Sequence, residues 1–142
     1  MKLLVTGGLG YIGSHTVVSL LDAGYEVIII DNLSNSHLSV LKRINNICLR
    51  KASFIEGDIR NRTVLNQIFN SYNIDAVIHF AGLKSVDQSI SSPISYYDNN
   101  VVGTLALLEE MLRHDVMRFI FSSSATVYGS PKSIPIKESN EV

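Results

Sequence analysis

Glycines crowd the residues that follow the first apolar stretch of the chain. Gly7, Gly10 and Gly13 fit the spacing G-x-x-G-x-x-G, and Gly8 completes the narrower spacing G-x-G-x-x-G. Glycines permit a tight turn from strand to helix, and the N–H groups at the start of a helix attract phosphate. Similar spacings occur in ordinary turns, so the surrounding elements decide what this one means.

An acidic residue follows the glycines at the distance where a ribose would lie. Asp31 ends a second apolar run and comes about 20 residues after Gly13, as this motif requires. A carboxylate there can accept both ribose hydroxyls of an adenosine and would repel a 2′-phosphate. The combination predicts a dinucleotide site that takes NAD rather than NADP.

The elements that must position these residues alternate between strands and helices. Apolar runs predict strands at 2–6, 26–30, 53–57, 75–80 and 118–121. Helices are predicted at 14–23, 38–47, 63–72 and from Pro93 to about Arg113, with a short helix less clearly marked within 83–92. The short, unalternating strands are typical of a parallel sheet covered on both faces. We therefore expect an α/β, Rossmann-type doubly wound parallel sheet with strand order 3-2-1-4-5.

Composition narrows the function classes. The 142 residues are 46% hydrophobic and 18% charged, which is a globular balance. The net charge of −1 argues against a nucleic-acid or membrane-surface partner. One cysteine, Cys48, excludes an internal disulfide framework and is expected to fill apolar space. The early glycines interrupt a signal-like start and no apolar run is long enough for a membrane span, so a cytoplasmic protein is expected.

Ligands of such sheets bind beyond the carboxyl ends of the strands. Small and polar residues follow the strands there: Asp31, Asp58, Ala81–Gly82 and Ser122–Ser124. Asp58 could accept the adenine amino group, or could be only a turn residue. No G-x-S-x-G context surrounds the serines, so none is expected to be a nucleophile.

Other polar residues near the carboxyl ends of the strands have both a ligand-binding and a structural interpretation. Lys84 could meet a phosphate or ribose, or be a solvated surface lysine. The loop 32–37 could contact a ribose or be a connector. Asn99 and Asn100 fall inside the predicted long helix, where asparagine is unfavourable, and this predicts a bonding partner for at least one of them. The four histidines show no metal-ligand spacing, so no metal site is expected, and His79 is read as a satisfied core residue.

Six blocks of the sequence resemble one enzyme family. They are Thr6–Gly13, Asp31–Leu33, Glu56–Arg60, His79–Lys84, Tyr96–Asn100 and Phe119–Gly129. Together they are similar to the UDP-glucose 4-epimerases of the extended short-chain dehydrogenase/reductase family, and the match covers nearly the whole chain. Such enzymes hold NAD tightly, interconvert UDP-glucose and UDP-galactose, and form homodimers through helices, of which the Pro93 helix would be one.

The resemblance also implies site residues. Those that would contact NAD, with the glycine loop included, are Gly7, Gly10, Tyr11, Ile12, Gly13, Asp31, Asn32, Asn35, Ser36, Asp58, Ile59, Phe80, Ala81, Gly82, Lys84 and Asn99. Ser124 would hold the substrate hydroxyl near the catalytic base.

The chain departs from the family at its end. The family's Tyr-x-x-x-Lys pair follows the serine block on a further helix, and the sequence stops at Val142 before it. Tyr128 and Lys132 have this spacing, but Gly129 and Pro131 disfavour the helix that would align them. We therefore expect residues 1–142 to form an incomplete NAD-binding domain that lacks the substrate domain and is inactive alone. A sister nucleotide-sugar 4,6-dehydratase and a non-catalytic NAD-binding module stay open as alternatives.

Overall fold

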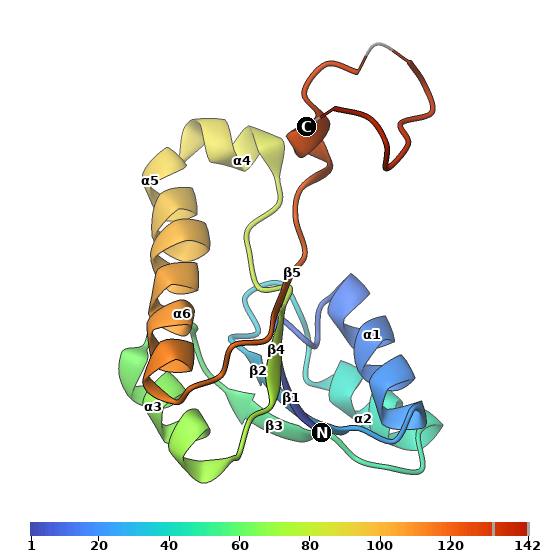
Figure 1. Ribbon diagram of the computed structural model, residues 1–142, viewed down its shortest axis with the longest axis vertical. Coiled ribbons are helices and arrows are strands. Elements are labelled where there is room, and N and C mark those ends of the chain that lie inside the picture. The colour runs from blue at the N-terminus through green and yellow to red at the C-terminus, as the bar shows by residue number, and fades with distance from the viewer. Residues whose placement is uncertain (132, 142) are drawn as a thin grey trace.

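The chain forms a five-stranded parallel sheet with helices on both faces (Figure 1). This computed structural model describes residues 1–131 and 133–141. The strands are β1 (Lys2–Thr6), β2 (Glu26–Asp31), β3 (Ser53–Glu56), β4 (Ala76–His79) and β5 (Phe119–Phe121), in the order β3-β2-β1-β4-β5. The predicted fold class and strand order are confirmed.

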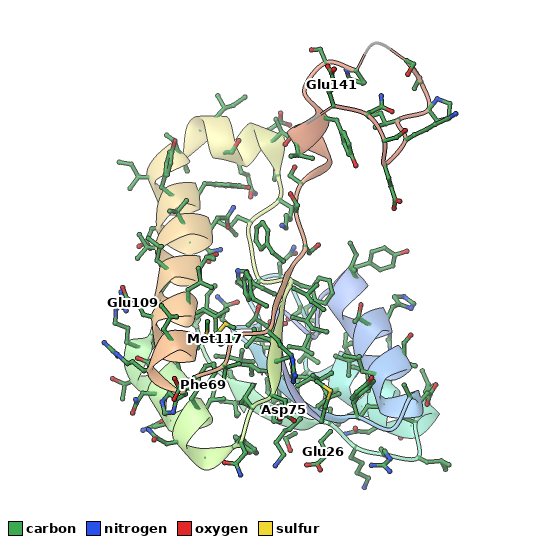
Figure 2. All side chains as sticks on the ribbon, in the orientation of Figure 1. Glu26, Phe69, Asp75, Glu109, Met117 and Glu141 are labelled. Carbon is green, nitrogen blue, oxygen red and sulfur yellow. The ribbon has the colours of Figure 1, made fainter. Side chains whose placement is uncertain are left out.

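Helices α1 (Tyr11–Asp22) and α2 (Ser39–Ile47) cover one face of the sheet, and α3 (Arg62–Ser71) and α6 (Gly103–Arg113) cover the other (Figure 1). Val5 and Ile29 pack toward the first pair of helices, while Leu4, Ile28 and Ile30 pack toward the second. Side chains fill both spaces between sheet and helices (Figure 2). Because both faces are buried, neighbouring strand residues are apolar on either side.

One predicted helix is interrupted. Instead of a single α-helix from Pro93 to Arg113, the structure has α5 (Pro93–Tyr96), a π-helical turn (Tyr97–Val102) and then α6. A π-turn inserts one residue per turn, and such turns are frequent at functional sites. The uncertain segment before it contains α4 (Val86–Ser91), so the expected short helix is confirmed.

The sheet ends on an uncovered strand. At β5, the last strand of the sheet, Ile120 is 60% and Phe121 52% exposed, as expected for an apolar edge without a neighbour. A short 3₁₀ turn (Ala125–Tyr128) follows, and residues 129–131 and 133–141 run away from the sheet (Figure 1). None of the described helices is long and apolar enough to cross a membrane.

Candidate cofactor cleft

The glycine loop joins β1 to α1 in a conformation that side chains would prevent. Gly7 has a φ of +66°, and a Cβ on it would lie 2.7 Å from the backbone nitrogen of Ala81. A Cβ on Gly13 would lie 2.3 Å from the Gly7 carbonyl oxygen. Gly13 therefore lets α1 approach the glycine loop itself.

The start of α1 presents unused hydrogen-bond donors. The N-cap residue is Gly10, which has no side chain that could accept from the first turn. The N–H groups of Tyr11, Ile12 and Gly13 have no acceptor among the described residues. Donors of this kind, with the positive end of the helix dipole, bind phosphate oxygens. Tyr11 and Ile12 are 84% and 58% exposed. The groups that they offer a ligand at the start of α1 are their backbone N–H groups.

Asp31 links the glycine loop to the loop after β2. The residue is only 8% exposed, and its carboxylate accepts hydrogen bonds from Leu9 N at 3.0 Å, Leu33 N at 3.0 Å and Ser36 Oγ at 2.8 Å. A carboxylate has about four lone-pair sites, so about one is left for a ligand. Binding both ribose hydroxyls, as the sequence suggested, would require Ser36 to give up its bond.

Asp58 is held by its neighbours. Its carboxylate accepts from Arg60 Nη2 at 2.7 Å and from Asn32 Nδ2 at 3.0 Å, and Arg60 also bonds Asp98 of the π-turn at 2.6 Å. The hydrogen bonds from Arg60 hold the pKa of Asp58 well below its ordinary value. The carboxylate thus ties the loop after β3 to the π-turn, and contact with an adenine stays a prediction.

The segment after β4 forms the opposite wall. Leu83 is clamped by Asn100, whose Oδ1 accepts from Leu83 N at 2.8 Å and whose Nδ2 donates to Leu83 O at 2.9 Å. The partner predicted for the Asn99–Asn100 pair is therefore a loop backbone. Lys84 lies in the same wall, and a Cβ on Gly82 would sit 3.4 Å from its Nζ.

These loops enclose a cleft of about 470 Å³, within the size range of small-ligand sites. Its predicted lining residues are Gly7, Gly10, Asp31, Asn32, Asn35, Ser36, Ile59, Phe80, Ala81, Gly82, Lys84 and Asn99. Tyr11, Ile12, Gly13 and Asp58 are the predicted residues that do not line it. The two charged side chains in the lining are Asp31 and Lys84.

Sequence reasoning missed five lining residues, which are Ile30, Gly57, Leu83, Ser85 and Gln88. Ser34 also lines the cleft and belongs to the loop 32–37, for which a ribose contact was one expectation. Ser85 caps α4 by accepting from Gln88 N at 3.4 Å. The pattern Ser85-x-x-Gln88 is a capping box, and this signal could have located the start of α4 beside the cleft.

The serine block lies apart from the cleft lining. Ser124 is exposed, and its hydroxyl bonds Thr126 Oγ1 at 2.7 Å and Thr126 N at 3.2 Å. Tyr128 ends the 3₁₀ turn, and Lys132, the other member of the rejected pair, lies outside the described residues. Within the described part of the chain, no three acidic, histidine or cysteine side chains are grouped to hold a metal ion.

His79 is a satisfied core residue, as the sequence predicted. It is 1% exposed and lies 2.6 Å from Thr6 Oγ1 through Nδ1 and 2.9 Å from Thr104 Oγ1 through Nε2. Burial, with a smaller effect of the Lys84 charge, lowers the pKa of His79 to about 4.

A 3-2-1-4-5 parallel sheet, a glycine loop that opens a helix and an acid at the end of β2 define a Rossmann-type domain. Comparisons with known proteins agree. The family model described as GDP-mannose 4,6 dehydratase matches residues 4–142. The chain is 56% identical over 138 residues to the UDP-glucose 4-epimerase of Yersinia enterocolitica, covering 97% of this chain and 41% of that protein.

Two further matches are equally extensive on this chain. A Klebsiella pneumoniae sequence of the same name is 56% identical over 139 residues, which is 98% of this chain and 100% of that sequence. The Bifidobacterium longum UDP-glucose 4-epimerase, crystallised with NAD+ and UDP, superimposes with a TM-score of 0.94 at 48% identity, over 99% of this chain and 42% of that one.

The chain belongs to the extended short-chain dehydrogenase/reductase family, in the group that contains the UDP-glucose 4-epimerases. It spans about 41% of the length of the Yersinia relative.

Proposed function

We propose that the cleft binds NAD and that the chain forms the cofactor-binding half of an enzyme interconverting UDP-glucose and UDP-galactose. The observation that carries the proposal is the row of unused N–H donors on Tyr11, Ile12 and Gly13, beside a glycine loop closed too tightly for side chains. These donors come directly after Gly10, which lines the cleft, and would hold the pyrophosphate. The Bifidobacterium relative, crystallised with NAD+ and UDP, supports the same ligand.

Asp31 favours NAD over NADP. Its buried carboxylate stands in the cleft lining, where a 2′-phosphate would bring a second negative charge against it. Lys84, the basic residue of the lining, belongs to the opposite wall after β4 and would contact a phosphate or ribose of the ligand. NAD, when bound, would supply a hydride acceptor, and this chain would bind it, orient it and exclude water from one side.

The reaction itself needs groups that we do not assign to this chain. Ser124 is proposed to orient the substrate hydroxyl, and residues 1–142 are proposed to be the NAD-binding domain without a substrate domain. A proton acceptor equivalent to the family's Tyr-x-x-x-Lys pair is not among our assignments, so we expect no turnover by the isolated chain. A cytoplasmic location stays a prediction from the sequence.

A sister 4,6-dehydratase is the second candidate, because the matching family model carries that description. The 56% identity to epimerases over nearly the whole chain favours epimerisation. A non-catalytic NAD-binding module would show the same cleft and no activity in any longer form.

A homodimer is also proposed. Ile94, Tyr97, Val101, Leu105 and Leu112 repeat at helical spacing from α5 to α6 and are 83%, 68%, 46%, 52% and 64% exposed. An exposed apolar stripe of this length along α5, the π-turn and α6 is typical of a surface that packs on another chain, and we propose a second copy.

Titration calorimetry with NAD tests the cofactor site. We expect the 142-residue chain to bind NAD with micromolar or tighter affinity. Asp31→Asn should weaken NAD binding and reduce the preference for NAD over NADP, because it removes the charge that repels a 2′-phosphate. Asp75→Asn is the matched control, since Asp75 likewise accepts from a backbone N–H, that of Lys2 at 2.6 Å, but at the opposite end of the sheet.

A folded wild-type chain that fails to bind NAD would contradict the proposed site. Detectable epimerisation by the pure chain would contradict the proposed lack of turnover. Equal losses of affinity in the Asp31 and Asp75 variants would show that the Asp31 effect is one of general stability.

A further inference from the structure

A series of hydrogen bonds, linked at Asn100 through the covalent structure of that residue, crosses the buried junction of β1, β4 and α6. Thr104 Oγ1 donates its proton to the backbone oxygen of Asn100 at 2.6 Å. It must therefore accept at its 2.9 Å contact with His79 Nε2, so this ring nitrogen carries the proton. The other nitrogen, Nδ1, then accepts from Thr6 Oγ1 at 2.6 Å. Each threonine hydroxyl thus donates one hydrogen bond and accepts another, and the histidine is a neutral, fixed tautomer.

Both ends of this chain reach the wall of the cleft. At one end, Thr6 Oγ1 accepts from the backbone N–H of Ala81 at 3.2 Å. At the other end, the Asn100 side chain bonds both the N–H and the carbonyl oxygen of Leu83. Ala81 and Leu83 line the cleft, so two alternate residues of the wall are held from the buried side.

The side-chain amide of Asn100 also orients the side chain of Asn99. Asn99 Nδ2 donates to Asn100 Oδ1 at 2.9 Å. This bond leaves Asn99 Oδ1 without a partner among the described residues, on a side chain that lines the cleft. A fixed acceptor oxygen there suits a hydroxyl or amide donor on a ligand.

We propose that His79, Thr104 and Asn100 are positioning residues that set the Ala81–Leu83 wall and the Asn99 amide for the part of a dinucleotide beyond its adenosine diphosphate. The inference rests on the proposed function, because it assigns one half of that ligand. The three residues are absent from the cleft lining and act through Ala81, Leu83 and Asn99. The Ala81–Leu83 wall follows β4, whereas Asp31, proposed to bind the adenosine ribose, ends β2 on the other side of β1. The wall and Asp31 would therefore contact different halves of the dinucleotide.

Two variants of one residue test the chain of bonds. Thr104→Val removes the hydroxyl while keeping the side-chain shape, and Thr104→Ser keeps the hydroxyl. We expect Thr104→Val to lower the affinity for NAD about three- to tenfold relative to the affinity for ADP, and Thr104→Ser to keep the wild-type ratio. ADP contains only the half that the wall does not serve. A general loss of folded protein would weaken both ligands equally.

Asn100→Ala should lower the same ratio, and Asn45→Ala is its matched control. Asn45 is half-buried and also binds a loop backbone, accepting from Ala52 N at 3.3 Å, but in α2 and outside the cleft lining. In the ligand-free chain, amide hydrogen exchange at Leu83 should accelerate in Thr104→Val and Asn100→Ala, and stay at the wild-type rate in Thr104→Ser and Asn45→Ala.

The outcomes separate the two proposals. An unchanged NAD-to-ADP ratio in Thr104→Val and Asn100→Ala would overturn the positioning role and leave the NAD site standing. A wild-type chain that binds neither nucleotide would refute the proposed function. In that case unchanged exchange at Leu83 in both variants would overturn the inference, and faster exchange would support the fixing of the wall.

Discussion

Single residues decide whether the cleft exists. Gly7 combines a φ of +66° with a neighbouring backbone nitrogen 2.7 Å from where its Cβ would lie. Neither problem can be relieved by a side-chain rotation, because the obstacle is the main chain of Ala81. The wall after β4 thus packs directly on the turn before α1.

Gly7→Ala should be clearly more destabilising than Gly24→Ala. Both residues have positive φ, and a side chain in that region costs about 1–2 kcal/mol. Gly24 has no atom within 4 Å of its would-be Cβ, whereas Gly7 meets Ala81, so we expect about 2 kcal/mol more loss at Gly7. Urea unfolding of the two variants measures this difference, and equal losses would mean that the loop can move away from Ala81.

At the level of elements, β1, β4 and α6 are joined by one buried imidazole. His79 is neutral in the folded chain because burial lowers its pKa to about 4, whereas an unfolded histidine has a pKa of about 6.5. Between these values the unfolded state binds more protons than the folded state. The free energy of unfolding therefore falls as the pH is lowered from about 6.5 to about 4.

The contribution of His79 to this fall is up to about 3 kcal/mol. Urea unfolding at several pH values should show a shallower fall for His79→Gln than for the wild type over this range. His37→Gln, at an exposed histidine, should keep the wild-type slope. Parallel slopes for the wild type and the His79 variant would show that the imidazole is protonated without cost.

The π-turn is the element that the sequence did not predict. Helical spacing and Pro93 indicated one regular helix, but the turn carries ties to two loops, through Asp98 to Arg60 and through Asn100 to Leu83. A π-turn changes which residues face the sheet, and this places Asn99 in the cleft lining. The pair of asparagines predicted a bonding partner, but not a break in the regular helix.

At the scale of the whole molecule, the exposed stripe from Ile94 to Leu112 predicts self-association. We expect the chain to sediment as a dimer, and Leu105→Glu to shift it to monomer, because a charge would be buried in the interface. Leu49→Glu, at a fully exposed leucine in a loop, should leave the dimer intact. Sedimentation velocity at increasing concentrations distinguishes the cases, and a wild-type monomer throughout would contradict the dimer.

The sequence by itself determined the sheet and most of the cleft lining. Apolar strands buried on both faces and right-handed crossovers allow few arrangements, so the strand order followed from the pattern. The carboxyl ends of parallel strands share one edge, which brought Gly7, Asp31 and Ala81 together as predicted.

Only the tertiary structure decided how the polar side chains pair. For Asp58 the sequence left open a ligand contact or a turn role, and it did not indicate that Arg60, two residues away, bonds both Asp58 and Asp98 of the π-turn. Likewise, the bonds of His79 and Asn100 join segments far apart in the sequence. Periodicity reports which side of an element is buried, whereas a hydrogen bond depends on distances of a few ångströms between elements, and these are set only when the helices pack on the sheet.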